Sequence, residues 1–409
     1  MTFVLTVKKV LGLSPGQLPS QPYRYTHDDA KKIYDLVLSG KLTHRSGHET
    51  TLLEKEFSEY SGTKYSVSTN SGTSALILAM KAIGIKPGDE VIVPAYTFIA
   101  VAQAVLVCGG TPVFADINNT FTISPDSVKT VVTTRTRAII VAHMFGNVAE
   151  MGKILSLARK QKLFVIEDCA QAIGAKYKGK RVGSIGDIGC FSFNEKKALP
   201  TGQGGMITTS NRVFLRNIVA SRNTGIETVD HQTDVTTFGY TMFMTEMEAS
   251  LARSILPQVD LLNQKRRKNF SNLVKRLSDV GDLIFPYRIV DGAEPSFSRF
   301  ACMVHFSHLT LTRDEFFKTI QAQGIPVKAF YPIPLYRYSL FQKRKDVLSG
   351  NTFPFSANRN VTYASLRLPF AERFFREQVG MEFSPYLSSG DIAYIVKTIK
   401  ASIDNHRKS

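Results

Sequence analysis

Short apolar segments alternate with longer amphipathic segments between about residues 50 and 220. The apolar segments are hydrophobic throughout, which is typical of strands that are buried on both faces of a sheet. The longer segments have the periodicity of helices. This alternation predicts an α/β fold with a mainly parallel sheet, because crossover helices join parallel neighbours. The predicted strands are Glu90–Ala95, Pro112–Asp116, Ala138–His143 and Leu163–Asp168, and the predicted helices are Ser74–Gly84, Ile99–Val107 and Ala149–Gln161.

The second half of the chain has a different pattern. A long helical segment is predicted from Thr245 to about Asp279, with an interruption at Pro257. Mixed strands and helices follow, for example Arg299–Phe306 and Arg313–Gln323. Because 409 residues exceed the usual size of one compact core, we expect two domains. The predicted division is an N-terminal extension over residues 1–30, a large domain over 31–260 and a smaller α+β domain over 261–409.

The charge balance is strongly basic, with 51 Lys and Arg residues against 34 Asp and Glu residues. A formal net charge of +17 would attract nucleic acids, anionic lipids or phosphorylated small molecules. The basic residues are scattered, however, and the densest runs are Lys265–Lys268 and Lys343–Lys345. The chain has no zinc-finger spacing and no aromatic-basic RNA signature. We therefore expect no nucleic-acid partner.

Cysteine usage and hydropathy favour a cytoplasmic protein. The four cysteines form no CxxC pair and are too few to staple a chain of this length, so reduced thiols are expected. The N-terminal apolar stretch contains lysines and is a poor signal peptide. No apolar run approaches about 18 residues, so no membrane span is predicted.

Two segments have features of a ligand site. Residues Asn70–Ser74 lead directly into a predicted helix, and a small-residue turn at a helix N-terminus offers free N–H groups to a phosphate. An ordinary helix cap would have the same sequence. Glu167 and Asp168 end a predicted strand, where ligands gather in open α/β sheets. A carboxylate there can keep a heterocyclic nitrogen protonated, although it can equally cap the next turn.

Two further segments could carry chemistry. Lys196 and Lys197 follow the strand-like CFSF stretch and precede a Gly-rich turn. A desolvated lysine loses its charge readily and becomes an amine nucleophile, whereas two exposed loop lysines would be inert. Phe98 follows the EVIVPA strand, where it could stack on a flat cofactor or simply belong to the core.

Together these stretches resemble one known family. NSGTSAL, GDEVIVPAYTFIA, VIEDCAQAIGA and GDIGCFSFNEKKALPTGQGG occur in the order found in the DegT/DnrJ/EryC1/StrS sugar aminotransferases, a branch of the fold type I pyridoxal-phosphate enzymes. The resemblance runs from about Ser39 to about Ile395. It implies a mainly parallel seven-stranded sheet flanked by helices, with a smaller C-terminal α+β domain. It also implies transfer of an amino group, from glutamate, to a keto sugar that is linked to a nucleotide.

The resemblance also implies roles for single residues. Lys197, five residues after Ser192 in the FSF-x-x-x-K pattern, matches the lysine that holds pyridoxal phosphate as a Schiff base and then moves the proton. Lys196 would point elsewhere. Asp168 matches the partner of the pyridinium nitrogen, which makes the ring an electron acceptor. Gln171 lies where the family places a group beside the ring hydroxyl.

Other matches concern the remainder of the cofactor. Gly72, Thr73, Ser74 and Ser192 match the phosphate cradle, and Phe98 matches the aromatic residue that stacks on the ring. Thr241 stands at the position that reaches the cofactor phosphate of the neighbouring subunit, so the resemblance implies a homodimer with shared active sites.

The chain departs from the family pattern near the expected acceptor and partner subunit. GYNYRM becomes GYTMFM, which places Thr241 and Phe243 where asparagine and arginine are common. HYPxPLH becomes FYPIPLY, with Phe330 and Tyr336 in place of both histidines. These changes leave open an acceptor such as a cyclitol or another ketone without a nucleotide. A sugar dehydratase, which has histidine at the lysine position, and a catalytically silent binding or regulatory paralogue are further alternatives. Lys197 and Asp168 speak against both.

Overall fold

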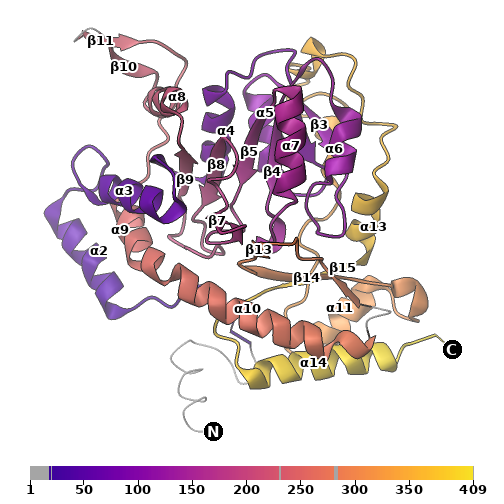
Figure 1. Cartoon of the computed structure of the whole chain (residues 1–409). Helices are drawn as coiled ribbons and strands as arrows, with labels where there is room; N and C mark the ends of the chain where they lie inside the picture. The colour runs from indigo at the N-terminus through magenta and orange to yellow at the C-terminus, as the bar shows by residue number, and fades with distance from the viewer. Residues whose placement is uncertain (1–17, 20, 230–231, 281–283, 409) are drawn as a thin grey trace.

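The computed structural model describes residues 18–19, 21–229, 232–280 and 284–408. Its centre is a seven-stranded sheet with the strand order β1–β9–β8–β5–β4–β2–β3 (Figure 1). The strands from β8 to β3 are mutually parallel, whereas β9 is antiparallel to both of its neighbours. The expected mainly parallel sheet is therefore confirmed. Its strands are β1 (Tyr65–Thr69), β2 (Glu90–Pro94), β3 (Thr111–Ala115), β4 (Thr136–Ala142), β5 (Phe164–Asp168), β8 (Ile188–Ser192) and β9 (Gly205–Thr209).

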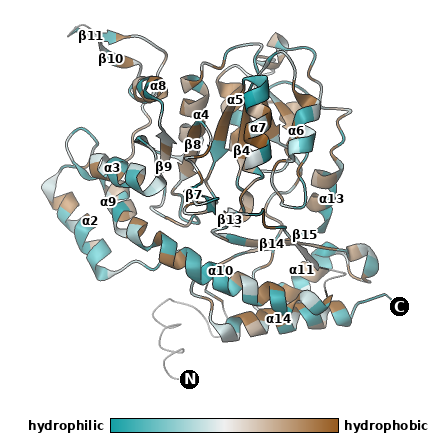
Figure 2. Ribbon diagram, in the orientation of Figure 1, coloured by the Kyte–Doolittle hydropathy of each residue, from teal (hydrophilic) through white to brown (hydrophobic). Residues whose placement is uncertain are grey.

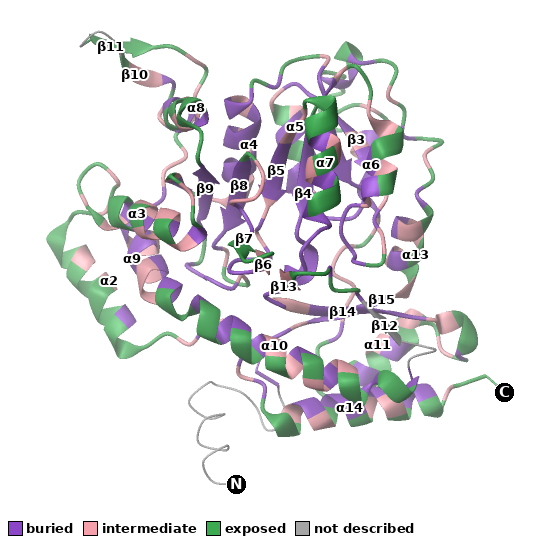
Figure 3. Ribbon diagram, in the orientation of Figure 1, coloured by how far each residue is buried: buried purple, intermediate pink, exposed green. Residues whose placement is uncertain are grey.

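Both faces of this sheet are covered, because successive side chains of one strand enter two different hydrophobic clusters. In β2, Val91 and Val93 belong to one cluster and Ile92 to the other. Figure 3 shows these central strands as buried along their length. The first cluster includes helices α4 (Gly72–Ala82), α5 (Ala100–Val107) and α8 (Arg212–Arg222). The second includes helices α3 (Glu49–Ser61), α6 (Pro125–Val131), α7 (Met151–Gln161) and α9 (Glu246–Ile255).

The C-terminal part is a smaller α+β layer. A three-stranded antiparallel sheet has the order β12–β14–β15, with β12 (Ile284–Pro286), β14 (Arg299–Val304) and β15 (Gln378–Glu382). Figure 2 shows α10 and α14 side by side, and buried apolar residues of both helices, such as Phe270 and Ile395, belong to the same hydrophobic cluster as β14 and β15. The remaining helices are α2 (His27–Ser39), α10 (Val259–Arg276), α11 (Arg313–Ala322), α12 (Ser339–Gln342), α13 (Pro369–Glu377) and α14 (Ser389–Asp404). Short strand pairs complete the fold: β6 (Lys176–Tyr177) with β7 (Lys180–Arg181) and β13 (Ala293–Glu294), and β10 (Ile226–Val229) with β11 (Gln232–Val235).

The predicted elements are present, with ends that differ by at most three residues. The interruption at Pro257 is also present as a 3-10 turn between α9 and α10. Most of the predicted N-terminal extension lies outside the described residues, and α2 begins within its range at His27. The two domain boundaries stay predictions. No helix in the described ranges combines the length and apolarity needed to cross a bilayer.

Candidate active site

One cavity of about 450 Å³ lies at the carboxyl ends of the central strands, where the large sheet meets the C-terminal layer. The large sheet brings Asp168 to it from the end of β5 and Ser192 from the end of β8. Of the nine residues predicted for the site, seven line this cavity: Gly72, Thr73, Phe98, Asp168, Gln171, Ser192 and Lys197.

Lys197 is a desolvated amine in this cavity. Burial and, to a lesser extent, the positive charge of Arg299 lower its pKa, Asp168 and Glu382 act in the opposite direction, and the resulting pKa is about 8. Among the described residues its Nζ has no hydrogen-bond or ion-pair partner. Lys196 also lines the cavity but is exposed, and its backbone amide donates to Asn194 Oδ1. The two adjacent lysines therefore have different environments.

The pH dependence of Lys197 follows from this shift. In the ligand-free protein, acetylation of Lys197 is expected to rise with pH around a midpoint of about 8, because the neutral, reactive amine predominates above the lowered pKa. Mass spectrometry of the Lys197 peptide after brief exposure to acetic anhydride measures this, with the exposed Lys268 as internal reference. A midpoint near the ordinary value of 10.5 would show that the amine is not desolvated.

Asp168 is poised to respond to a cation. Burial raises the pKa of its carboxyl, while the Ala170 amide, which donates to Oδ1 at 3.0 Å, and the positive charge of Lys197 lower it. The fully ionised form thus gains from a further positive group beside it. A protonated ring nitrogen is a group of this kind.

His143 and Glu167 form a buried pair behind Asp168 that the sequence did not indicate. The Ala149 amide donates to His143 Nδ1 at 3.2 Å, so this nitrogen carries no proton and Nε2 is the donor to Glu167 Oε2 at 3.0 Å. The other Glu167 oxygen accepts from the amides of Ile185 and Gly186. The two acidic residues at the end of β5 therefore have different roles. Glu167 forms hydrogen bonds within the fold, whereas Asp168 lines the cavity.

The N-terminus of α4 forms an anion cradle. Ser71 caps the helix by accepting from the Ser74 amide at 3.1 Å, while the Thr73 amide has no partner in the described chain. A Cβ on Gly72 would lie 2.7 Å from Ser192 Cβ, so glycine lets the helix start approach the end of β8. The Ser192 hydroxyl lies at the same place.

Ser74 and Thr241 were predicted for the site but do not line the cavity. The Ser74 amide is engaged by Ser71, and its hydroxyl donates to Asn70 Oδ1 at 2.6 Å. Thr241 is exposed and pairs with Asn223 in an isolated bridge, so within a single chain it is outside the site.

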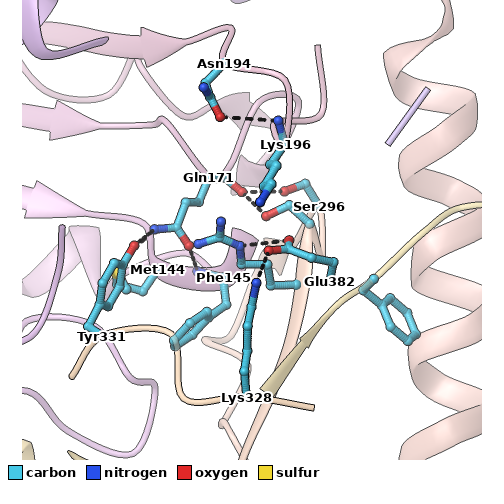
Figure 4. Close-up of polar contacts among 12 residues, drawn as sticks. Met144, Phe145, Gln171, Asn194, Lys196, Ser296, Lys328, Tyr331 and Glu382 are labelled. Carbon is cyan, nitrogen blue, oxygen red and sulfur yellow. Dashed lines mark hydrogen bonds and ion pairs between the residues drawn. The ribbon is translucent and has the colours of Figure 1, made fainter. Parts of the chain in front are cut away.

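Aromatic and amide groups shape the cavity wall. Phe98 is 51% exposed, which is high for a phenylalanine that follows a buried strand. Gln171 is fixed between two elements: its Oε1 accepts from the Phe145 amide and its Nε2 donates to the Tyr331 hydroxyl, each at 3.0 Å (Figure 4). A flat ring would find an exposed aromatic face on one side and a fixed amide near its edge.

The C-terminal layer contributes residues that sequence reasoning missed. Arg299, Lys328, Tyr331 and Glu382 all line the cavity. The one available signal was the FYPIPLY segment, which contains Tyr331 and stood out as a departure from the family pattern. Nothing in the sequence places Arg299 and Glu382 together.

The departures themselves have structural explanations. Phe243 stacks on His44 with ring centroids 5.2 Å apart, and the guanidinium carbon of Arg222 lies 5.1 Å from the centre of the Phe243 ring. Tyr336 is buried, and its hydroxyl donates to Glu372 at 2.6 Å. Both side chains are therefore integrated into the fold.

Comparisons with known proteins agree with this arrangement. The model of the DegT/DnrJ/EryC1/StrS aminotransferase family matches residues 24–400. The chain is 36% identical over 359 residues to UDP-N-acetyl-3-dehydro-alpha-D-glucosamine 3-aminotransferase of Acidithiobacillus ferrooxidans, covering 87% of this chain and 89% of that protein. It is 36% identical over 282 residues to GDP-perosamine synthase of Caulobacter vibrioides, covering 68% and 76%. The structure is similar to that of an aminotransferase from Psychrobacter cryohalolentis, with a TM-score of 0.84, 29% identity and coverage of 95% and 99%.

Proposed function

The chain belongs to the DegT/DnrJ/EryC1/StrS aminotransferase family, and we propose that it uses pyridoxal phosphate to move an amino group from glutamate to a nucleotide-linked keto sugar. The observation that carries this proposal is the single cavity that holds a desolvated lysine, a buried carboxylate and an anion cradle.

The residues of the cavity fit the cofactor. The free Thr73 amide and the Ser192 hydroxyl suit its phosphate, because a helix N-terminus favours an anion. Asp168 suits its ring nitrogen and Phe98 its flat face. When bound, the group supplies an electron acceptor for the bonds of the substrate carbon.

The protein's own task is positioning and proton transfer. With the cofactor bound, Asp168 would hold the ring nitrogen through its ionised carboxylate and would keep that nitrogen protonated. Lys197, with its pKa near 8, takes a proton from the donor's α-carbon in one half-reaction and returns one to the acceptor carbon in the other. A pKa close to the working pH suits an amine that must act as both base and acid.

The acceptor is proposed from the relatives and from a second cavity. Two relatives are named for nucleotide-linked sugars. A cavity of about 770 Å³ adjoins the first and shares Lys196, Lys328 and Glu382 with it, which leaves room for an acceptor larger than a monosaccharide. The departures at Phe330 and Tyr336 keep a cyclitol or another ketone as the alternative.

Assembly and location complete the proposal. Thr241 lies outside the cavity of its own chain, which suits a homodimer in which it serves the partner's site. All four cysteines are free thiols and three of them are buried, which suits a reducing cytoplasm.

A spectroscopic titration tests the function. Protein purified with pyridoxal phosphate is expected to be yellow, and L-glutamate alone is expected to convert this spectrum to that of the aminated cofactor, with release of 2-oxoglutarate. Adding a panel of nucleotide-linked keto sugars should then restore the first spectrum for the true acceptor. The absence of any change with all common amino acids would favour the dehydratase or the silent paralogue.

A further inference from the structure

Arg299 and Glu382 form a cross-strand pair on the wall of the active-site cavity. They are direct partners in the antiparallel register of β14 and β15. Arg299 Nε donates to Glu382 Oε2 at 3.1 Å, and the two side chains are only 12% and 16% exposed. The register of two strands thus places an ion pair beside Lys197.

Neighbouring residues hold this guanidinium in one orientation. Lys328 Nζ donates to the other Glu382 oxygen at 3.0 Å, as Figure 4 shows. The Arg299 guanidinium carbon lies 4.6 Å from the centre of the Phe330 ring. A Cβ on Gly380 would lie 2.3 Å from Phe330 Cε2, so glycine makes room for the ring. The phenylalanine that replaces a common family histidine therefore serves as a platform for the arginine.

The cavity-facing groups of this cluster retain capacity to donate. No hydrogen bond joins either Arg299 Nη to a carboxylate among the described residues; the bond to Glu382 uses Nε. The Tyr331 hydroxyl accepts from Gln171 Nε2 and lies within hydrogen-bonding reach of the Arg299 side chain, so the two groups sit side by side, and in the described chain no acceptor binds the hydroxyl proton. An arginine edge and a tyrosine O–H together suit a carboxylate, which accepts through two oxygens.

The charges in the cavity point the same way. Arg299 is close enough to Lys197 to lower its pKa, so the positive charge on this wall is not fully cancelled by Glu382. Glu382 is shared with Lys328, and together these two cations hold its pKa below the ordinary range although burial raises it. The single carboxylate of Glu382 therefore pairs with two cations, Arg299 and Lys328, and a carboxylate of a ligand would neutralise the remaining positive charge.

We propose that Arg299 and the Tyr331 hydroxyl bind a carboxylate of the amino-acid donor, with Glu382 as the positioning residue for Arg299. This inference rests on the proposed aminotransferase function and names the site that selects its donor. An α-amino acid must present its nitrogen close to Lys197 and its carboxylate a short distance away, and Arg299 lines the same cavity close enough to Lys197 to influence its charge. A nucleotide-linked keto sugar carries its negative charge on the diphosphate and not on the carbon that reacts at Lys197, so an arginine beside Lys197 matches the donor better than the reacting part of the acceptor.

Donor and acceptor half-reactions measured separately test the proposal. In Arg299→Gln, the glutamate concentration for half-maximal conversion is expected to rise roughly 10- to 100-fold, since charged bidentate hydrogen bonds are lost. The KM for the acceptor, and the yellow spectrum, should change little. Arg299→Lys keeps the charge without the fork and should recover part of the loss. Arg181→Gln, which removes an arginine–carboxylate pair from outside both cavities, is the matched control.

A binding measurement without turnover completes the test. Calorimetry with glutarate, a dicarboxylate that cannot react, is expected to give a Kd roughly 10-fold or more weaker for Arg299→Gln, and a smaller weakening for Tyr331→Phe. Unchanged glutarate binding, or an effect on the acceptor KM alone, would overturn the donor assignment. Conversion of the wild-type protein by glutamate is scored independently, so a failure of the proposed function is recognised separately.

Discussion

Replacing Lys197 with alanine is expected to lower amino transfer roughly 10⁴-fold or more, because the covalent attachment and the proton transfer are lost together. The yellow colour that depends on this amine should also disappear. Steady-state assays of 2-oxoglutarate release and the visible absorption spectrum of the purified variant measure the two effects.

Lys196→Ala is the informative comparison, because Lys196 lines the same cavity but is exposed. It should keep the colour of the wild type. If Lys197→Ala retained colour and full turnover while Lys196→Ala lost them, the assignment of the reactive amine would be wrong by one position.

Replacing Asp168 with asparagine is expected to reduce turnover roughly 10²- to 10⁴-fold while leaving Lys197 able to bind the cofactor. The amide is nearly the same size but carries no charge, so the charge that favours the protonated ring nitrogen over the neutral one is lost. Stopped-flow absorbance after mixing with glutamate measures the affected half-reaction directly.

The two substitutions are distinguished by their spectra. Asp168→Asn should stay coloured and slow, whereas Lys197→Ala should be colourless and slow. Turnover of Asp168→Asn within a few-fold of the wild type would show that another group keeps the ring nitrogen protonated. His143 is not that group, because both of its ring nitrogens are already engaged.

The large sheet was predictable because its signal is local. Strands such as β2 are buried at all five positions, so an uninterrupted apolar run marks them regardless of the remainder of the chain. The start of α4 was predicted two residues late, because several residues of Asn70–Ser74 could cap a helix and the structure uses Ser71. An error of two residues at a helix start leaves the predicted strand ends, and therefore the predicted position of the site, unchanged.

The candidate site divides in the same way. Asp168, Ser192 and Lys197 lie at or just after strand ends, and parallel topology alone brings such ends together. Arg299 and Glu382 are separated by more than 80 residues and meet only through the register of β14 and β15. A register between distant strands leaves no trace in a single sequence, so this half of the cavity required the structure. The catalytic roles of the predicted residues stay predictions.

The larger hydrophobic cluster limits how the protein could be dissected. It runs without a break from α4 and α5, through strand residues such as Val93, to α14 residues such as Ile395 in the C-terminal layer. A chain cleaved near residue 260 would therefore yield two fragments that each expose apolar surface which is buried in the intact protein. Each fragment would be a poor candidate for separate expression. Because the two fragments share one hydrophobic cluster, we expect them to associate with each other and not to be soluble separately.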